Sequence, residues 1–262
     1  MTVVIGAIAP HGDPAFVEGS TTRLAFEELG RRFERAEPDV TVVFTPHNVH
    51  VEGAFAVVTA ARLAGSLDQL PVDLECQVDR ELAAGVLASL REAGLPAVGV
   101  SYGSNDESLA VMPLDWGTLI PLWFLGGRSD EPRPVVVVSP ARDLALADHV
   151  RAGAAVALAC AGRRAAMVAS ADHGHAHDPG GPFGFDPAAA EYDARVVELV
   201  CENRLGDAVE LEPIVDAASA DSLWQLVLLH GALGDGFEAE LLSYECPTYF
   251  GMICAAFGPH VV

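Results

Sequence analysis

The sequence predicts an α/β protein, a single three-layer domain with a mostly parallel or mixed central sheet flanked by helices. Three observations predict it. Short runs of apolar, often β-branched residues alternate with longer stretches whose apolar residues recur at helical spacing. The short runs are apolar throughout, as in strands that are covered on both faces. No shift in composition divides residues 1–262, so we expect one domain.

In the first half of the chain, the alternation begins with a strand and a helix. "TVVIGAIA" is rich in β-branched residues, and "LAFEELGRRFERA" carries apolar residues at helical spacing. "ELAAGVLASLREAG" ends on a glycine, the residue favoured just past a helix C-terminus. We therefore expect strands over residues 2–9, 40–46 and 96–101, and helices over residues 24–36 and 81–94.

The second half of the chain repeats the alternation with more strongly apolar strands. "PVVVVS" leads into a long stretch in which Pro140 suits the first turn of a helix. "RAAMVAS" has the pattern of a buried strand and ends just before a cluster of histidines. We expect strands over residues 134–139, 164–170 and 248–257, and helices over residues 140–162, 187–203 and 219–233.

The chain is strongly acidic, since 15 Lys plus Arg against 37 Asp plus Glu give 15 − 37 = −22. Such a charge repels phosphate backbones and anionic lipid headgroups, which argues against nucleic acid and membrane surfaces as partners. The five cysteines are odd in number and never spaced as CxxC, which indicates reduced thiols. No basic segment precedes the first apolar run, so we expect a cytoplasmic protein.

Histidines directly follow three of the expected strands. His11 follows the first strand, His47 follows the second, and the three histidines of "HGHAH" (173–177) follow the strand over residues 164–170. A proline precedes each of the first two histidines and restricts the local backbone. Because the carboxyl ends of parallel strands meet at one edge of a sheet, we expect these side chains to converge there.

The histidines raise the question of a metal site. Two imidazoles and one carboxylate, with open positions opposite, form the ligand set of non-haem Fe(II) oxygenases. The sequence has no HExxH motif, so the ligands would come from separate elements. The residues by themselves predict a His/carboxylate metal site, while a turn or surface position is the plainer interpretation of each single histidine.

Five segments of the chain resemble, in the same order, motifs of the class III extradiol ring-cleavage dioxygenases. This is the protocatechuate 4,5-dioxygenase-like family, to which the Memo-type proteins are related. The segments are "APHGD", "TPHNVHVEGAF", "LDWGTLIPLWFLGG", "ASADHGHAHDPGGPFGFD" and "LSYECPTYFGMICAAF", and they run from His11 to Phe257. The resemblance implies Fe(II) as the cofactor, a small aromatic substrate and O2 as reaction partners, and assembly into a homo-oligomer.

The resemblance also implies which residues hold the iron. His11 and His47 match the two histidine ligands of the family. The family's carboxylate ligand lies on a late helix, where this chain has Asp221 and most ring-cleaving members have Glu. Glu245 is the alternative ligand, and Glu52 is a more distant one. In another role, Asp221 suits the N-cap or the first turn of the apolar helix that follows it.

The family's general base is a histidine, and in "SADHGH" the matching residue is His175, with Asp172 as its orienting partner. A base that titrates near pH 7 suits catechol chemistry, because a catechol chelates iron only after losing protons. The plainer interpretation makes the clustered histidines solvated loop residues, and we adopt it for His173 and His177. Asp13 is expected to orient a metal ligand.

The segment "LDWGTLIPL" departs from the family at Trp116, where ring-cleaving members usually have a histidine that donates a proton or contacts substrate. An indole stacks on an aromatic ring and donates one hydrogen bond, but it cannot shuttle protons. His50 or His173 would then take over proton transfer, or the chain does not cleave rings. We expect Trp116, His50 and Phe183 to contact the substrate, with Tyr249 nearby.

Two functions from different classes follow. The first is a non-haem Fe(II)-dependent extradiol dioxygenase that cleaves a catechol-like or aminophenol-like aromatic ring with O2. The alternative is a Memo-like protein that binds a metal or ligand on the same scaffold without cleaving rings. A zinc hydrolase would use the same ligands and is a third interpretation.

Overall fold

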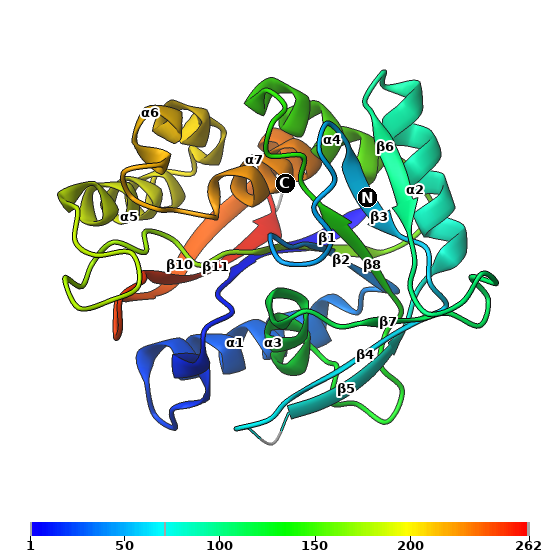
Figure 1. Cartoon of the computed structure of the whole chain (residues 1–262), viewed down its shortest axis with the longest axis horizontal. Helices are drawn as coiled ribbons and strands as arrows, with labels where there is room; N and C mark the ends of the chain where they lie inside the picture. The colour runs from blue at the N-terminus through cyan, green and yellow to red at the C-terminus, as the bar shows by residue number, and fades with distance from the viewer. Residues whose placement is uncertain (1, 71, 261–262) are drawn as a thin grey trace.

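The structure is a computed structural model that describes residues 2–70 and 72–260. Its central element is a mixed sheet of eight strands. β1, β9, β2 and β8 are parallel to one another, whereas β11 is antiparallel to β1 and β3 is antiparallel to β8. Four parallel strands therefore end at the same edge, in the middle of the sheet (Figure 1). In spatial order the strands are β10 (Phe237–Glu245), β11 (Met252–Pro259), β1 (Val3–Ala9), β9 (Ala165–Ser170), β2 (Val40–Phe44), β8 (Val135–Ser139), β3 (Phe55–Val58) and β6 (Ala97–Val100).

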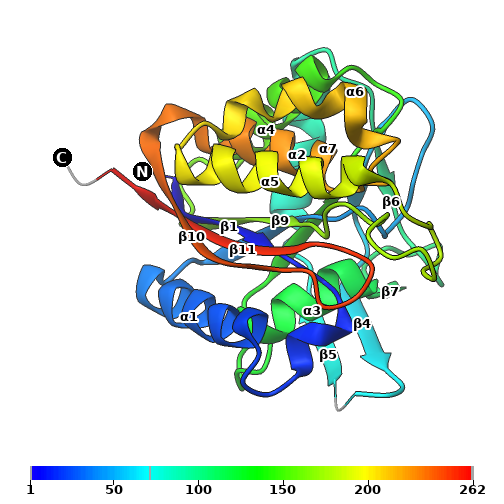
Figure 2. The ribbon, with the colours of Figure 1, turned by 90° about the vertical axis from the view of Figure 1, so that its left-hand side faces the viewer.

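Helices cover both faces of this sheet, as Figure 2 shows. One face carries α1 (Thr21–Ala36), α3 (Trp116–Phe124) and a small sheet of β5 (Val72–Gln77), β4 (Arg62–Leu67) and β7 (Val111–Pro113). The other face carries α2 (Arg80–Glu92), α4 (Leu146–Ala159), α5 (Pro187–Cys201), α6 (Glu212–Val215) and α7 (Leu223–Leu233). The short 3-10 helices are η1 (Asp13–Phe16), η2 (Leu205–Leu211) and η3 (Gly234–Gly236). The arrangement confirms the three-layer α/β fold predicted from the sequence.

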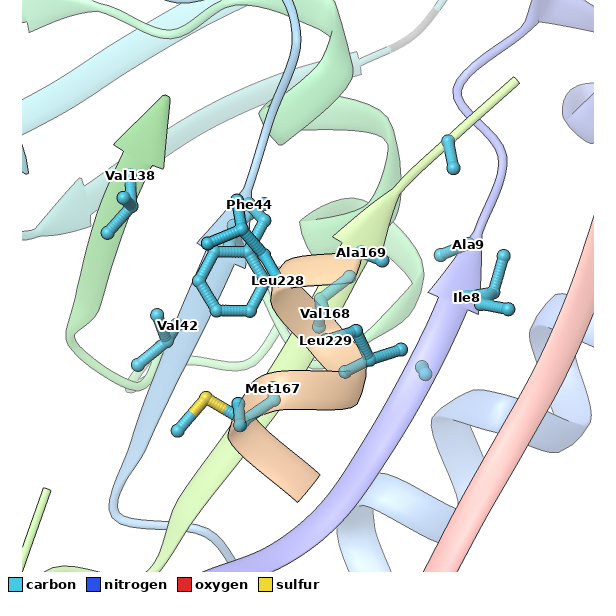
Figure 3. Close-up of a cluster of buried hydrophobic side chains, with 14 of the residues drawn as sticks. Ile8, Ala9, Val42, Phe44, Val138, Met167, Val168, Ala169, Leu228 and Leu229 are labelled. Atoms are coloured by element: carbon cyan, nitrogen blue, oxygen red, sulfur yellow. The ribbon is translucent and has the colours of Figure 1, made fainter. Parts of the chain in front are cut away.

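Beneath the edge at which the four parallel strands end, the hydrophobic core lies between α7 and these strands. Leu228 and Leu229 of α7 are fully buried and lie over Phe44 of β2 and Val168 of β9 (Figure 3). Burial stabilises the fold by about 1.5–3 kcal/mol for each leucine. α7 leads into β10, which runs in the same direction as β1, so α7 begins at the carboxyl edge of the parallel strands. The residues just before α7 are thereby held at that edge.

The helix expected over residues 140–162 is shorter in the structure. α4 begins at Leu146, so the prediction that Pro140 stands in its first turn is wrong. Residues 140–145 instead form a loop after β8. Asp143 of this loop accepts a hydrogen bond from the N–H of Gly53 at 2.7 Å. A contact between distant loops, which local propensity does not report, therefore ties down the segment.

Several elements were absent from the sequence prediction. The missed strands are short or half-exposed: β3 has four residues, β7 has three, and β5 alternates between buried and exposed positions. β3 and β7 are too short to carry a clear period, whereas the apolar–polar alternation of β5 was a strand signal that the sequence prediction overlooked. The helix expected from residue 219 begins at Leu223, because Ser219 has a φ of 50° and ends the preceding turn.

The five cysteines are free thiols, and those at positions 76, 160 and 254 are buried. Within residues 2–70 and 72–260, no helix combines the length and the apolar character needed to cross a bilayer.

Candidate metal centre and active site

The carboxyl ends of the four parallel strands surround a cavity of about 1160 Å³. His11 follows β1, His47 follows β2, His175 follows β9 and Arg142 follows β8, and all four line this cavity. The loop before α7 adds Asp221. Residues that are far apart in the sequence therefore meet at the edge where an open α/β sheet places its chemistry.

His11, His47 and Asp221 bring one ligand atom each to a common point. Nε2 of His11 lies 2.9 Å from Nε2 of His47, and Nε2 of His47 lies 3.4 Å from Oδ2 of Asp221. The ligand atoms of the three residues all lie within 4.8 Å of one another. The two rings meet edge to face at an angle of 88°, so both nitrogens can point at one position between them.

Ser170, the last residue of β9, decides which nitrogen of His11 faces the cavity. The Ser170 hydroxyl donates its only hydrogen to the carbonyl oxygen of Gly117, an atom that can only accept. Oγ of Ser170 therefore accepts a hydrogen bond from Nδ1–H of His11, 2.9 Å away. The lone pair of His11 is then on Nε2, the atom that faces His47 and the cavity. Such a partner on the other ring nitrogen is typical of a histidine that binds a metal.

The ionisation states of the two histidines suit a cation, and the unpaired oxygen of Asp221 suits it as well. Burial lowers the pKa of His11 well below its usual value and lowers the pKa of His47 to about 4, so both rings are neutral at pH 7. Burial raises the pKa of Asp221 to about 7. Oδ1 of Asp221 is buried without a hydrogen-bond partner among the described residues. A metal ion would satisfy this oxygen, and two imidazole nitrogens with a carboxylate match the ligand set of Fe(II) oxygenases.

Asp172 lies against His11. Its Oδ1 accepts a hydrogen bond from the backbone N–H of His11 at 2.9 Å, and its Oδ2 lies 3.5 Å from Nε2 of the same residue. β9 pairs with β1 in a register that sets Ser170 opposite Ala9, which carries Asp172 to the position beside His11. The sequence interpretation paired Asp172 with His175 instead. Burial, followed by the charge of Asp221, raises the pKa of Asp172 well above its usual value.

His175 lines the cavity with one nitrogen already engaged. Nδ1 of His175 lies 2.7 Å from the carbonyl oxygen of His173, and because a carbonyl only accepts, Nδ1 carries the hydrogen. Nε2 of His175 is then the unprotonated nitrogen. Burial lowers the pKa of His175, which keeps the ring neutral at pH 7. The ring stacks on Phe250 with a centroid distance of 5.4 Å, so its orientation is fixed.

The prediction that His173 and His177 are solvated loop residues is wrong. His173 is fully buried, and its Nδ1 lies 3.0 Å from Oγ of Ser222, which in turn lies 3.0 Å from the hydroxyl of Tyr192. Because Ser222 follows Asp221 directly, this chain of hydrogen bonds holds the segment that carries the carboxylate. Nε2 of His177 pairs with Oδ2 of Asp193 at 2.9 Å. Both histidines are structural partners that pattern did not identify.

Trp116 packs against His47. Its indole stacks on His47 with a centroid distance of 4.3 Å and an interplanar angle of 29°. Half of Trp116 is exposed, and it lines the cavity. The indole therefore supports the ring of His47 and also offers an aromatic surface to whatever occupies the cavity.

Asp115 is a functional residue that the sequence interpretation missed. It is the N-cap of α3, where its side chain accepts hydrogen bonds from the Thr118 N–H and hydroxyl. The same carboxylate accepts hydrogen bonds from Oγ1 of Thr45 at 2.8 Å and from Nδ2 of Asn48 at 3.0 Å. The loop that carries His47 is thus tied to the start of α3. An Asp directly before a helix was the available signal.

Most of the remaining predicted residues line the cavity, and Glu245 has a different role. His50, Phe183, Tyr249 and Asp13 line the cavity, at positions from which they can contact an occupant. Glu245 accepts a hydrogen bond from the N–H of Thr22 at the start of α1.

Among the described residues, the ligand atoms that converge belong to His11, His47 and Asp221 rather than to Glu245 or Glu52. Glu245 serves the N-terminus of α1, and Glu52 is exposed to solvent. Asp221 is not the N-cap of α7, because that position belongs to Ser222. The geometry therefore favours Asp221 as the third ligand.

Arg142 is the other residue that the sequence interpretation missed. It follows β8 and lines the cavity, with its guanidinium 4.8 Å from the ring centroid of Trp224. The available signal was its place after a strand, which it shares with His11 and His47.

Comparison with known proteins places this arrangement in a family. The profile of the catalytic LigB subunit of aromatic ring-opening dioxygenase matches residues 7–258. Protein CA_C1420 of Clostridium acetobutylicum is 22% identical over 242 residues, which cover 90% of this chain and 51% of that protein. The 2-aminophenol 1,6-dioxygenase alpha subunit of a Pseudomonas species is 26% identical over 174 residues, which cover 63% of this chain and 61% of that protein. The chain thus spans about half to three fifths of the length of these relatives.

A solved structure shares the fold. The crystal structure of uncharacterized protein JW3007 from Escherichia coli K12 matches with a TM-score of 0.68 and 15% sequence identity, covering 97% of this chain and 100% of that chain. At this identity the likeness concerns the fold alone. The family profile, in contrast, spans nearly the whole chain from the end of β1 to the end of β11. The chain therefore belongs to the family of the catalytic LigB subunit of aromatic ring-opening dioxygenases.

Proposed function

We propose that this chain is a non-haem Fe(II)-dependent extradiol dioxygenase that opens a catechol-like or aminophenol-like ring with O2. The observation that carries the proposal is the convergence of His11, His47 and Asp221 within 4.8 Å at a cavity that His175 also lines. Membership of a family of ring-opening dioxygenases supports it, and so does the similarity to the aminophenol dioxygenase subunit. That relative is an alpha subunit, which supports assembly with further chains.

In this proposal His11, His47 and Asp221 hold the metal. Bound Fe(II) would supply Lewis-acid and redox chemistry toward the aromatic substrate and O2. Ser170 keeps Nδ1 of His11 protonated and Nε2 available. Trp116 keeps the ring of His47 in place by stacking on it. The protein's contribution is therefore a fixed set of neutral nitrogens and one carboxylate beside a partly exposed aromatic surface.

His175 acts as the general base. Nε2 of His175 accepts the proton of a substrate hydroxyl, while its Nδ1–H remains bonded to the carbonyl oxygen of His173 and stabilises the resulting imidazolium. Burial lowers the pKa of His175, so the ring is unprotonated and ready to accept a proton at pH 7. Phe183 meets the ring of His175 edge-on, with the two ring centroids 5.4 Å apart.

A second histidine returns a proton during the reaction, because the indole of Trp116 cannot shuttle protons. Of the two candidates, His50 lines the cavity, whereas His173 is fully buried and bonded to Ser222. We therefore assign proton return to His50. The alternative function, a Memo-like binding protein that does not cleave rings, is favoured by the same substitution, because Trp116 stands where ring-cleaving members usually have histidine.

A measurement of turnover distinguishes the dioxygenase from the binding protein. The protein is purified without oxygen, loaded with Fe(II), and mixed with O2 and either catechol, 2-aminophenol or their carboxylated derivatives. We expect O2 consumption together with the absorbance of a ring-opened product, and His175→Ala should remove both while the bound iron stays unchanged. Iron bound in stoichiometric amount without turnover of any of these compounds would overturn the dioxygenase and favour the binding protein.

A further inference from the structure

Arg142 differs from every other arginine of the chain. The chain has no lysine, so its 15 basic residues are all arginines. Each of the others donates to a carboxylate or to a backbone carbonyl. Arg142 makes neither kind of contact within the described residues. Five donors in a fixed planar arrangement are thus left without an acceptor on the wall of the cavity.

The placement of Arg142 is defined by its surroundings. Its guanidinium lies over Trp224, 4.8 Å from the ring centroid, and a stacked arrangement of this kind restrains the side chain. The loop that carries it is held by the hydrogen bond between Asp143 and the N–H of Gly53. The side chain is half-buried, so its charge is only partly solvated. A half-buried guanidinium without a partner gains from an anion that reaches it.

Arg142 lines the same cavity as Asp221, His47 and His175. A metal bound to Asp221 would neutralise the charge of that carboxylate. The guanidinium is then the remaining positive group for a second anion.

We propose that Arg142 is a specificity-determining residue that binds a carboxylate on the aromatic substrate. This inference rests on the proposed function and narrows its substrate class to catechols or aminophenols that carry a carboxylate. The planar fork of a guanidinium fits a carboxylate through two parallel hydrogen bonds. A cavity of about 1160 Å³ has room for a ring and its substituent. The overall charge of −22 repels anions, so Arg142 supplies the local attraction that such a ligand needs.

The test measures binding without turnover. Under anaerobic conditions, calorimetry gives the Kd values of 3,4-dihydroxybenzoate, 2,3-dihydroxybenzoate and catechol for the Fe(II)-loaded protein. We expect the better dihydroxybenzoate to bind about 10- to 100-fold more tightly than catechol, as a charge-assisted bidentate contact provides. In Arg142→Gln this ratio should fall to near one, and Arg142→Lys should keep part of it.

Arg128→Gln is the matched control, because Arg128 also lies over a tryptophan, Trp123, but is exposed and lies outside the cavity lining. It should keep the wild-type ratio. A wild-type ratio near one, or a ratio unchanged in Arg142→Gln, would overturn the inference. Failure of the proposed function appears differently, as absence of turnover for charged and uncharged compounds alike. Cleavage of catechol or 2-aminophenol without any preference for a carboxylate overturns the role of Arg142 alone.

Discussion

Nδ1 of His11 lies 2.9 Å from Oγ of Ser170, and this contact sets which nitrogen of His11 can bind a metal. The serine hydrogen is already donated to Gly117, so the histidine must donate and its Nε2 keeps the lone pair. The ligand chemistry of His11 is thus controlled from the end of the neighbouring strand, β9.

Ser170→Ala should weaken metal binding without unfolding the protein. Loss of the acceptor frees His11 to adopt the other tautomer, and loss of such a partner typically costs 10- to 100-fold in metal affinity, about 1.4–2.7 kcal/mol. Competition with a chromophoric chelator measures the change. Ser243→Ala, at a buried serine of β10, is the control and should keep wild-type affinity. Equal affinities in both variants would contradict the role of Ser170.

Substitution of a proposed metal ligand and substitution of the proposed base should have different effects on metal binding and turnover. His11→Ala and His47→Ala should each abolish metal binding, because each removes one of the three convergent ligand atoms. His175→Ala should retain the metal and lose about 10²- to 10⁴-fold in turnover, the usual contribution of a general base. Metal analysis and O2 consumption measure the two effects. His260→Ala, at an exposed histidine near the end of β11, should change neither. Retention of metal in both ligand variants would exclude the site.

The stability of the metal-free protein should depend on pH through the ionisation of Asp221. Burial raises the pKa of Asp221 to about 7 from a usual value of 3.8, so the folded state binds the extra proton between these values. The stabilisation from that proton is complete below about pH 4 and is lost as pH rises to about 7. Metal-free Asp221→Asn should therefore be more stable than wild type at pH 8, by about 2–4 kcal/mol in the free energy of unfolding.

Urea unfolding at pH 8 and pH 4 measures this difference, which should shrink at the lower pH. Added metal should raise the stability of wild type at pH 8 and leave Asp221→Asn unchanged, because only a protein that binds the metal gains from it. A difference between the variants that is the same at both pH values would show that Asp221 is ionised throughout.

Gly117 lies where α3 meets the His47 loop, and it should not tolerate a side chain. A Cβ at Gly117 would lie 2.7 Å from Oγ1 of Thr45 and 3.1 Å from Cδ2 of His47. Gly117→Ala should cost about 1–3 kcal/mol in the free energy of unfolding and lower metal affinity as His47 shifts. Gly85→Ala is the matched control, because this glycine of α2 has open space and an alanine there should stabilise by about 0.4–1 kcal/mol. Thermal unfolding with and without metal distinguishes the two.

The sequence predicted the convergence of His11 and His47 for a local reason. His11 and His47 each stand just past a strongly apolar strand and after a proline, and a parallel sheet brings such positions to one edge. The buried, strongly apolar strands and the longer helices were predicted for the same reason. The main differences lie in the start of α4, in the short strands β3 and β7, and in the half-exposed strands β4, β5 and β10. Local pattern was sufficient for strands that are apolar throughout, and it missed those at exposed positions.

The histidine cluster after β9 shows where local pattern fails. His173, His175 and His177 look alike in sequence, yet one is buried against Ser222, one lines the cavity, and one pairs with Asp193. The side-chain partners of His173 and His177 lie 49 and 16 residues away, respectively. Alternation along an extended segment sends neighbouring side chains in different directions, and only the packing of α5 and α7 decides what each one meets.

The sequence by itself determined the α/β class, the strands that end in His11 and His47, and the resemblance that directed attention to Asp221 and His175. Only the tertiary structure decided that Asp172 serves His11, that Asp115 ties the His47 loop to α3, and that Arg142 faces the same cavity. These contacts join residues on different strands and helices, such as Ser170 and His11 at a separation of 159 positions. Burial and hydrogen-bond partners at that range arise from packing, which propensity and periodicity along the chain do not encode.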